Sequence, residues 1–238
     1  AACQGEEVTF TAVSQDAETY TWFIDGAQIE NNNNSTLNYT FTEASNYEVK
    51  LTVSNNGCSA ENVKTITINP LPNAGFESPE AACQGEEVTF TAVSQDAETY
   101  TWFIDGAQIE NNNNSTLNYT FTEASNYEVK LTVSNNGCSA ENVKTITINP
   151  LPNAGFESPE AACQGEEVTF TAVTQDAESY TWFIDGTQLS DNNLPTLSYT
   201  FNETREYEVK LTVSNNGCSD ENVKTITINP LPNAEFTS

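Results

Sequence analysis

The stretch TYTWFIDG, residues 19–26, carries the pattern from which the fold can be predicted. Its large side chains Tyr20, Trp22 and Ile24 occupy every second position, which predicts a half-buried β-strand, and the Asp-Gly pair that ends it predicts a two-residue hairpin turn. The same alternation recurs in four further stretches: EEVTFTAV (6–13), TLNYTF (36–41), YEVKLTV (47–53) and NVKTITI (62–68). No stretch has the period of a helix, so the sequence predicts an all-β fold of antiparallel strands.

Two stretches are less regular. Val63 is out of phase with Ile66 and Ile68, which predicts a β-bulge near Lys64. The stretch NAGFES (73–78) has one inward residue, Phe76, and predicts a short strand that opens each complete repeat.

The chain is a tandem repeat. Residues 1–80 and 81–160 have the same sequence, and residues 161–238 repeat it with substitutions concentrated between 187 and 206. A unit of about 80 residues has the size of a small autonomous domain. The units are separated by the linker NPLPN, whose two prolines favour an extended, stiff connection. It occurs at 69–73, 149–153 and 229–233.

These linkers predict the domain boundaries. We expect a repeat at 1–70 that lacks its first strand, complete repeats at 71–150 and 151–230, and the first strand of a further repeat at 231–238. Two interpretations of the tail remain open. Either the chain is a segment of a longer array, or residues 231–238 of one subunit complete the first repeat of another by strand addition.

The composition excludes several classes of function. With 34 acidic and 7 basic residues the formal net charge is −27, so nucleic acid and anionic membrane surfaces would repel the chain. No apolar run is long enough for membrane insertion. The chain has no His and no Gly-rich phosphate loop, and adjacent carboxylates such as Glu6 and Glu7 point to opposite faces of a strand. We therefore expect no enzyme activity and no cofactor.

Calcium is the one ion with candidate ligands. Asp16, Glu18, Glu77 and Glu80 could gather near a junction between repeats, as oxygen ligands of this ion. The chain has no EF-hand pattern, however. The alternative is that these carboxylates are solvated and keep the surface charged.

Each repeat contains two cysteines, one in AACQG and one in NNGCS. They are Cys3, Cys58, Cys83, Cys138, Cys163 and Cys218. Their even distribution, without CxxC spacing and without His, predicts disulfides formed in an oxidising compartment rather than a zinc site. We therefore expect an extracellular protein.

With the strands in order, two motifs resemble the PKD domain, an immunoglobulin-like β-sandwich. One is Tyr20-x-Trp22 leading into Asp25-Gly26, and the other is YEVKLTV at 47–53. The family's usual Phe-Gly-Asp-Gly is Phe-Ile-Asp-Gly here, so the first glycine of that hairpin is missing. The resemblance covers each repeat and implies tandem immunoglobulin-like (PKD-type) antiparallel sandwiches arranged head to tail as a rod. The expected core residues are Trp22, Trp102, Trp182, Tyr47, Tyr127 and Tyr207.

The topology implied by this resemblance bears on the disulfides. It places the two cysteines of a repeat at opposite ends, several strand residues apart, whereas a disulfide needs Cα atoms within about 7 Å. This favours bridges between neighbouring repeats, Cys3–Cys138 and Cys83–Cys218, with Cys58 and Cys163 paired to repeats outside the segment. The alternative is a bridge inside each repeat, which would be Cys3–Cys58, Cys83–Cys138 and Cys163–Cys218.

The linker and cysteine motifs are also similar to those of PKD-like arrays in very large secreted surface proteins of gliding and adhesive bacteria. This resemblance implies a structural segment of a cell-surface adhesin or extracellular filament, a disulfide-stiffened stalk for adhesion or gliding motility. The expected partners are neighbouring identical repeats, surface polysaccharide or other filament subunits. The alternative is a carbohydrate-binding or accessory module of a secreted hydrolase, for which Phe23 and residues 27–46 are the candidate surface.

Overall fold

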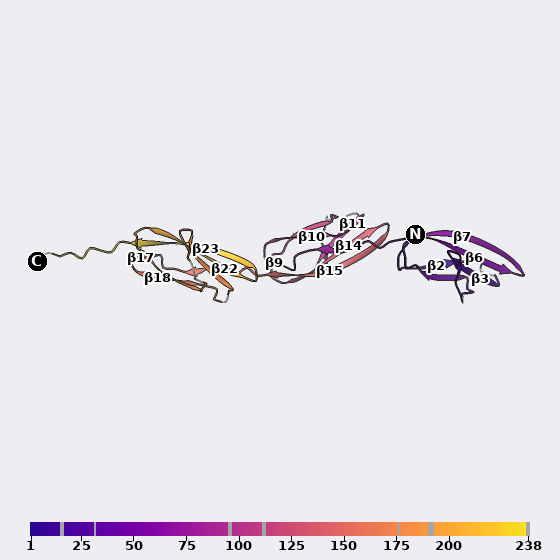
Figure 1. The fold of residues 1–238 in the computed structure, drawn as a ribbon, viewed down its shortest axis with the longest axis horizontal. Coiled ribbons are helices and arrows are strands. Elements are labelled where there is room, and N and C mark those ends of the chain that lie inside the picture. Colours follow the sequence, from indigo (N-terminus) through magenta and orange to yellow (C-terminus); the bar gives the residue numbers. More distant parts are fainter. Residues whose placement is uncertain are drawn as a thin grey trace. The chain divides into compact units, whose positions relative to one another are not determined.

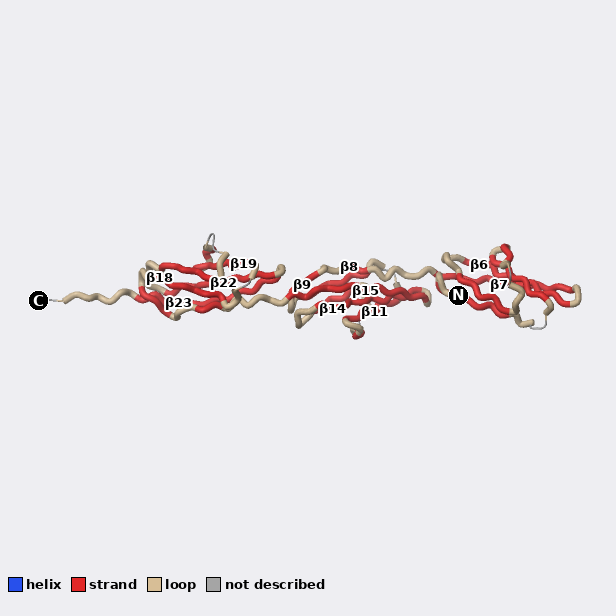
Figure 2. Tube along the Cα trace, turned by 90° about the horizontal axis from the view of Figure 1, so that it is seen from below, coloured by secondary structure: helices blue, strands red, loops and turns tan. Residues whose placement is uncertain are grey.

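The computed structural model is an all-β protein of three immunoglobulin-like sandwiches in tandem (Figures 1 and 2). The described residues contain no helix, and so none that could cross a membrane. The structure describes residues 1–14, 17–30, 32–94, 97–110, 113–175, 177–189 and 193–236.

Chain contacts divide the molecule into two compact units, with the division inside the second repeat. The first unit comprises residues 1–78, 89–117 and 128–144, and the second comprises 79–88, 118–127 and 145–238. Each unit therefore contains one outer repeat together with part of the second repeat.

The first repeat has a five-stranded sheet in the order β1-β7-β6-β3-β4, with a two-stranded sheet β2-β5. The long strands β6 and β7 are neighbours in Figure 1. The strand bounds are β1 (Ala2–Cys3), β2 (Glu7–Thr11), β3 (Thr19–Ile24), β4 (Ala27–Gln28), β5 (Thr36–Thr40), β6 (Asn46–Asn55) and β7 (Cys58–Asn69).

The second and third repeats follow the same plan, but their smaller sheets have three strands, β13-β10-β8 and β16-β18-β21. The second repeat contains β8 (Phe76–Glu77), β9 (Ala81–Cys83), β10 (Glu87–Ala92), β11 (Thr99–Ile104), β12 (Ala107–Gln108), β13 (Thr116–Thr120), β14 (Asn126–Asn135) and β15 (Cys138–Asn149). The third contains β16 (Phe156–Glu157), β17 (Ala161–Cys163), β18 (Glu167–Ala172), β19 (Ser179–Ile184), β20 (Thr187–Gln188), β21 (Thr196–Thr200), β22 (Glu206–Asn215) and β23 (Cys218–Asn229). The added strand is β8 or β16, the short strand that includes Phe76 or Phe156.

One pairing in each large sheet is parallel, which the antiparallel pattern predicted from the sequence does not include. β1 runs beside the end of β7, with Ala2 opposite Ile68 and Cys3 opposite Asn69. β9 pairs with β15 and β17 with β23 in the same register. This pairing brings the first cysteine of a repeat to the point where its last strand ends.

The expected bulge near Lys64 is wrong. β6 and β7 pair without interruption from Asn46 opposite Thr67 to Asn55 opposite Cys58, and Val49 lies opposite Lys64. Opposite residues of an antiparallel pair share a face, so Lys64 points to the inner face and Val63 to the outer one, where it is 46% exposed.

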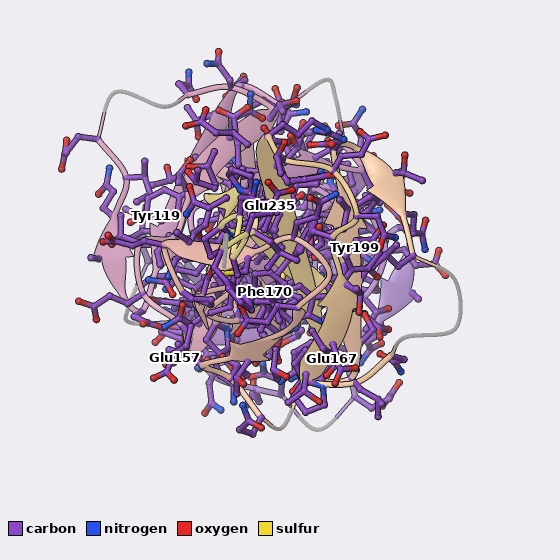
Figure 3. All side chains as sticks on the ribbon, turned by 90° about the vertical axis from the view of Figure 1, so that its left-hand side faces the viewer. Tyr119, Glu157, Glu167, Phe170, Tyr199 and Glu235 are labelled. Atoms are coloured by element: carbon purple, nitrogen blue, oxygen red, sulfur yellow. A yellow bond between two sulfur atoms is a disulfide. The ribbon has the colours of Figure 1, made fainter. Side chains whose placement is uncertain are left out.

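The core of each repeat is built on its tryptophan. Trp22, Trp102 and Trp182 are buried, and each donates its indole N–H to a backbone carbonyl. Tyr207 is buried, and Tyr47 and Tyr127 are half-buried; all three donate their hydroxyls to the carbonyl four residues earlier. In the end-on view of Figure 3, Phe170 lies near the middle and Glu157 and Glu167 lie towards the edge. Phe170 is fully buried.

Candidate functional site

The first candidate site is the disulfide that joins the first repeat to the second. Cys3 is bonded to Cys138, with Cα atoms 5.6 Å apart. Cys3 stands beside Asn69, and the Asn69 side-chain amide donates to the carbonyl of Asn136 at 3.0 Å. A covalent bond and a hydrogen bond therefore both connect the end of the first repeat to the NNGC turn of the second.

The second junction repeats this arrangement. Cys83 is bonded to Cys218 at the same Cα separation of 5.6 Å, and the Asn149 amide donates to the Asn216 carbonyl at 3.0 Å. The pairing inside each repeat does not occur in the structure. Cys58 and Cys163, the remaining two cysteines, are free and exposed.

The NNGC turn has the backbone that this contact requires. Asn136 and Gly137 have φ of 51° and 79°, the left-handed pair of a type I′ hairpin turn. Such a turn needs Asn, Asp or Gly, because other side chains are strained at positive φ. The turn leaves the Asn136 carbonyl pointing outwards to accept the bond from Asn69. Cys138, which follows, is only 1% exposed.

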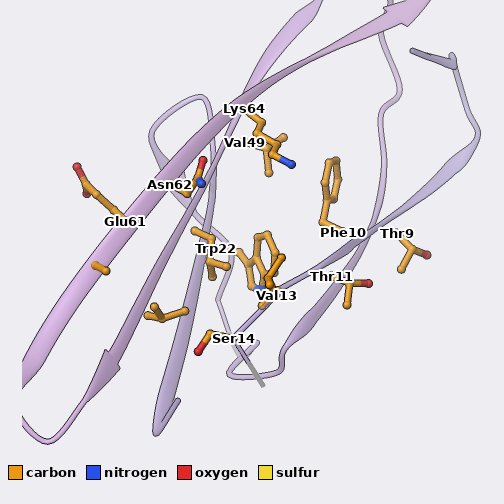
Figure 4. A pocket seen from close by; sticks show the side chains of 14 residues that line it. Thr9, Phe10, Thr11, Val13, Ser14, Trp22, Val49, Glu61, Asn62 and Lys64 are labelled. Carbon is orange, nitrogen blue, oxygen red and sulfur yellow. The ribbon is translucent and has the colours of Figure 1, made fainter. Parts of the chain in front are cut away.

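The second candidate site is a groove in the first repeat with a volume of about 500 Å³. Its wall includes Phe10, Trp22 and Lys64, which gather around one space in Figure 4. The rest of the lining comes from β2, the residues that follow it, β6 and β7: Thr9, Thr11, Ala12, Val13, Ser14, Val49, Leu51, Val53, Ala60, Glu61 and Asn62.

The same place is filled in the other two repeats. Phe76 pairs with Ala92 and packs with its ring 5.3 Å from that of Trp102. Phe156 pairs with Ala172 and lies 5.2 Å from Trp182. Both phenylalanines are 2% exposed, so the short strand β8 or β16 supplies an essential part of the core.

The first repeat has no counterpart of β8, and comparing it with the second repeat, which has the same sequence from its AACQG motif on, shows how this changes the exposure of side chains. Phe10 is half-buried, whereas its counterpart Phe90 is completely buried. Val13 is fully exposed, whereas Val93 is 53% exposed and donates its N–H to Gly75. Because residues 1–80 and 81–160 are identical, this difference comes from what covers these side chains and not from the side chains themselves.

A lysine that sequence reasoning missed completes the filled sites. Lys144 donates to the Phe76 carbonyl and lies 5.1 Å from the centre of the Phe76 ring. Lys224 makes the same two contacts with Phe156. Their counterpart in the first repeat, Lys64, lines the groove. The sequence does contain a signal, because Lys64 alternates with the inward residues Ile66 and Ile68. A search for alternating apolar residues alone overlooks a lysine at such a position.

The structure describes the surroundings of Phe23, one of the surface candidates from the sequence. Phe23, the candidate glycan contact, is half-buried with the Lys50 ammonium 4.3 Å from its ring centre. Asp16, one of the expected calcium ligands, lies outside the described residues. Among the residues that are described, no group of three or more acidic, cysteine or histidine side chains is arranged to hold a metal ion.

The substituted region of the third repeat contains Arg205, which forms ion pairs with Asp185 and Glu203. Arg205 replaces a serine and contacts Asp185, with Nη1 and Oδ2 2.6 Å apart, and its guanidinium stacks 3.6 Å from the Tyr207 ring centre. The pKa of Asp185 is lowered, first by the hydrogen bond from the Glu208 backbone N–H and then by Arg205. The bond to Asp185 in turn raises the pKa of Arg205.

Comparison with known proteins identifies the repeats. The family profile of the PKD domain matches residues 1–68, 76–148 and 156–228. A search of curated proteins found no match.

Solved structures resemble the chain in fold alone. Three N-terminal domains of the bacteriophage RB49 outer capsid protein Hoc are 14% identical, with a TM-score of 0.47 and coverage of 97% of this chain and 96% of that one. Titin domains I67–I69 are 17% identical, with a TM-score of 0.46 and coverage of 96% and 94%. A Bacteroides ovatus protein, SGBP-B, solved with a mixed-linkage heptasaccharide, is 15% identical with a TM-score of 0.28. The match covers 96% of this chain and 65% of SGBP-B.

Proposed function

Because the chain belongs to the PKD domain family, with a match in each of its three repeats, we propose that it is a stalk segment. It would hold a binding or motile part of a larger extracellular assembly away from the cell, in adhesion or in movement over surfaces. The observation that carries this proposal is the pair of disulfides between neighbouring repeats, Cys3–Cys138 and Cys83–Cys218.

The physical argument concerns bending at the linker. A single extended linker restricts the backbone but still lets two domains rotate about it. A second covalent connection, beside a hydrogen bond, means that bending must also distort the disulfide geometry. Each junction in this chain has that second connection, so stiffness is the property that the bridges supply.

The surface composition supports the same role. A net charge of −27 makes neighbouring stalks repel one another, which keeps them separate and extended from the surface. Disulfides favour an extracellular location. Tandem PKD domains are typically non-catalytic structural modules, and we propose that this chain is not an enzyme. Its partners would be the adjoining repeats, surface polysaccharide or other filament subunits.

The alternative role, a carbohydrate-binding accessory module, has less support. Sugar-binding surfaces need aromatic faces that a sugar ring can reach. Phe23, Phe103 and Phe183 are the counterparts of one another in the three repeats, and each has a lysine ammonium 4.3 to 4.6 Å from its ring centre. A glycan would have to displace that ammonium before it could stack.

Small-angle X-ray scattering tests the stalk proposal. The reference protein carries Cys58→Ser and Cys163→Ser, which leaves both bridges and removes the free thiols. The test variant also carries Cys3→Ser and Cys138→Ser. We expect that fitting the scattering of the test variant requires conformers with a wider range of maximum dimensions, because one junction then bends freely. Circular dichroism should show that the repeats stay folded. Equal distributions in the two proteins would contradict a stiffening role.

A further inference from the structure

The AACQG cysteine of each junction bridge is followed by a turn that places a carboxylate beside it. In the second repeat, the Glu86 N–H donates to the Cys83 carbonyl at 3.0 Å, and the Glu86 carboxylate accepts the Cys83 N–H at 3.1 Å. Gly85 has φ of 82°, which lets the chain turn back between them. Glu6 makes the same two bonds with Cys3, at 3.0 Å each. A carboxylate is therefore held next to each bridge.

The distance from this carboxylate to the sulfur follows from covalent geometry. The Cys83 sulfur is three bonds from the backbone nitrogen that donates to Glu86, so the carboxylate oxygen lies within about 7 Å of it. Among the described residues, neither Glu6 nor Glu86 takes part in an ion pair with a lysine or arginine. No such pair cancels the negative charge beside the bridge.

The two sulfurs of each bridge differ in how far they can be reached. Cys218 and Cys138 are 1% exposed. Their partners, Cys83 and Cys3, are half-buried. A thiol that breaks a disulfide has to reach the sulfur that it attacks. Access therefore directs such a thiol to Cys83 or Cys3, the cysteine beside the carboxylate.

Reduction of the bridge by small thiols involves negative charge at each step. A thiolate attacks the Cys83 sulfur and forms a mixed disulfide, while the bond to Cys218 breaks and its sulfur leaves with the electron pair as a thiolate. A second thiolate then displaces Cys83 from the mixed disulfide. Two small thiols have become one small disulfide, and their two protons end on the two cysteines.

We propose that Glu86 and Glu6 are electrostatic guards, which slow cleavage of the bridges by anionic thiols. At ~7 Å in water, the repulsion between two unit charges slows attack about threefold, and more where protein replaces part of the water. A thiolate with a second negative charge is repelled more strongly, and one that also carries an ammonium group is repelled less. The guard therefore discriminates between thiols by their charge.

This inference goes beyond the stalk proposal, because it concerns how the bridges react and not what they hold in place. The alternative is that Glu86 only closes the turn. Glutamine also has a carbonyl oxygen that accepts the Cys83 N–H, so Glu86→Gln removes the charge and keeps the hydrogen bond. Failure of the guard would leave the stiffening role of the bridges intact.

Rates of reduction of the whole chain test the guard. Every protein carries Cys58→Ser and Cys163→Ser, which removes the two free thiols. Equal concentrations of thiolate are supplied as mercaptoacetate, 2-mercaptoethanol or cysteamine, whose thiolate forms are doubly negative, singly negative and neutral overall. Acid stops the reaction, and alkylation in denaturant marks free Cys218, which mass spectrometry measures in the tryptic peptide 211–224.

The expected result depends on the charge of the thiol. Glu86→Gln should raise the rate with mercaptoacetate at least about threefold, less with 2-mercaptoethanol and least with cysteamine. The increase should shrink at about 1 M salt, which screens charges more than ~3 Å apart.

Two controls accompany this variant. The first bridge is an internal standard in the same sample, because Glu6 is unchanged. Its rate, measured from free Cys138 in the peptide 131–144, should stay the same. Glu87→Gln removes the same charge from the next residue, which is exposed at the start of β10, and should have a clearly smaller effect than Glu86→Gln.

Four results would overturn the proposal. An unchanged rate in Glu86→Gln would show that its carboxylate does not oppose attack. Equal acceleration by Glu86→Gln and Glu87→Gln would mean that only the overall charge matters. Equal acceleration with all three thiols would mean that the substitution loosens the turn. A mixed disulfide found first on Cys218 and not on Cys83 would place the attack away from the carboxylate.

Discussion

Stretching the chain by its ends, by force spectroscopy on single molecules, gives the sharpest test of the disulfide arrangement. The variant to pull carries Cys58→Ser and Cys163→Ser, so that only the two bridges between repeats remain. These bridges form overlapping loops, because Cys83 lies inside the loop closed by Cys3 and Cys138. Once all repeats unfold, the load follows the shortest covalent path and not the whole backbone.

That path can be followed through the two bonds. It runs from Ala1 to Cys3, crosses to Cys138, goes back along the backbone to Cys83, crosses to Cys218 and continues to Ser238. It contains about 77 backbone steps, or ~270 Å at ~3.5 Å per residue. With the bridges reduced, all of the roughly 237 steps extend, to ~830 Å. The oxidised chain should therefore stop at about a third of the reduced length.

The alternative pairing inside each repeat gives a different length in the same variant. Only Cys83–Cys138 would then survive, and the path would have about 182 steps, or ~640 Å. That result would refute the reasoning. A matched control adds Cys83→Ser and Cys218→Ser, which leaves Cys3–Cys138 alone and should give about 102 steps, or ~360 Å.

Three further predictions concern stability. Phe90→Ala should cost about 3–5 kcal/mol in chemical denaturation and Phe10→Ala clearly less, since Phe90 is fully buried and Phe10 is not; equal losses would show that the groove is closed in solution. Gly137→Ala should lower stability by about 1 kcal/mol in the same assay, because φ there is 79°, and no loss would mean that the turn adopts another form. The pKa of Asp185 is lower in the folded protein than in the unfolded chain, so the ionised carboxylate stabilises the fold above the unfolded pKa near 4, and this stabilisation is lost as the pH falls through the folded pKa. Asp185→Asn should therefore make the melting temperature fall less between pH 7 and 2. An unchanged dependence of melting temperature on pH would contradict this.

The sandwich could be predicted from the sequence because its information is local. Tyr20, Trp22 and Ile24 alternate in a way that only a strand with one buried face satisfies. The Asp-Gly and Asn-Gly pairs mark their turns through the positive φ that the structure shows at Asp25 and Asn56. These signals depend on neighbours within a few residues.

The features that could not be predicted depend on contacts between residues that are far apart in the sequence. A bulge is expected near Lys64 from the sequence because Val63, as an inward residue, is out of phase with Ile66 and Ile68. The filled repeats show why a lysine belongs there: Lys144 reaches a carbonyl of a strand 68 residues away. The parallel pairing of Ala2–Cys3 with β7 is equally non-local, since a two-residue strand carries no pattern of its own. The groove lies where the sequence analysis expects the first repeat to lack a strand, but the side chains that are left uncovered there, Phe10 and Val13, depend on packing and not on a local pattern.

The overlapping loops also bear on survival after proteolysis. A single backbone cut between Cys3 and Cys218 always leaves its two fragments joined by at least one of the two disulfides. A protease outside the cell that nicks an exposed loop, such as the one around Asn34, would therefore not release the distal part of the chain. Severing it requires cuts at more than one place, so the molecule keeps its two ends connected after damage that would divide a simple string of domains.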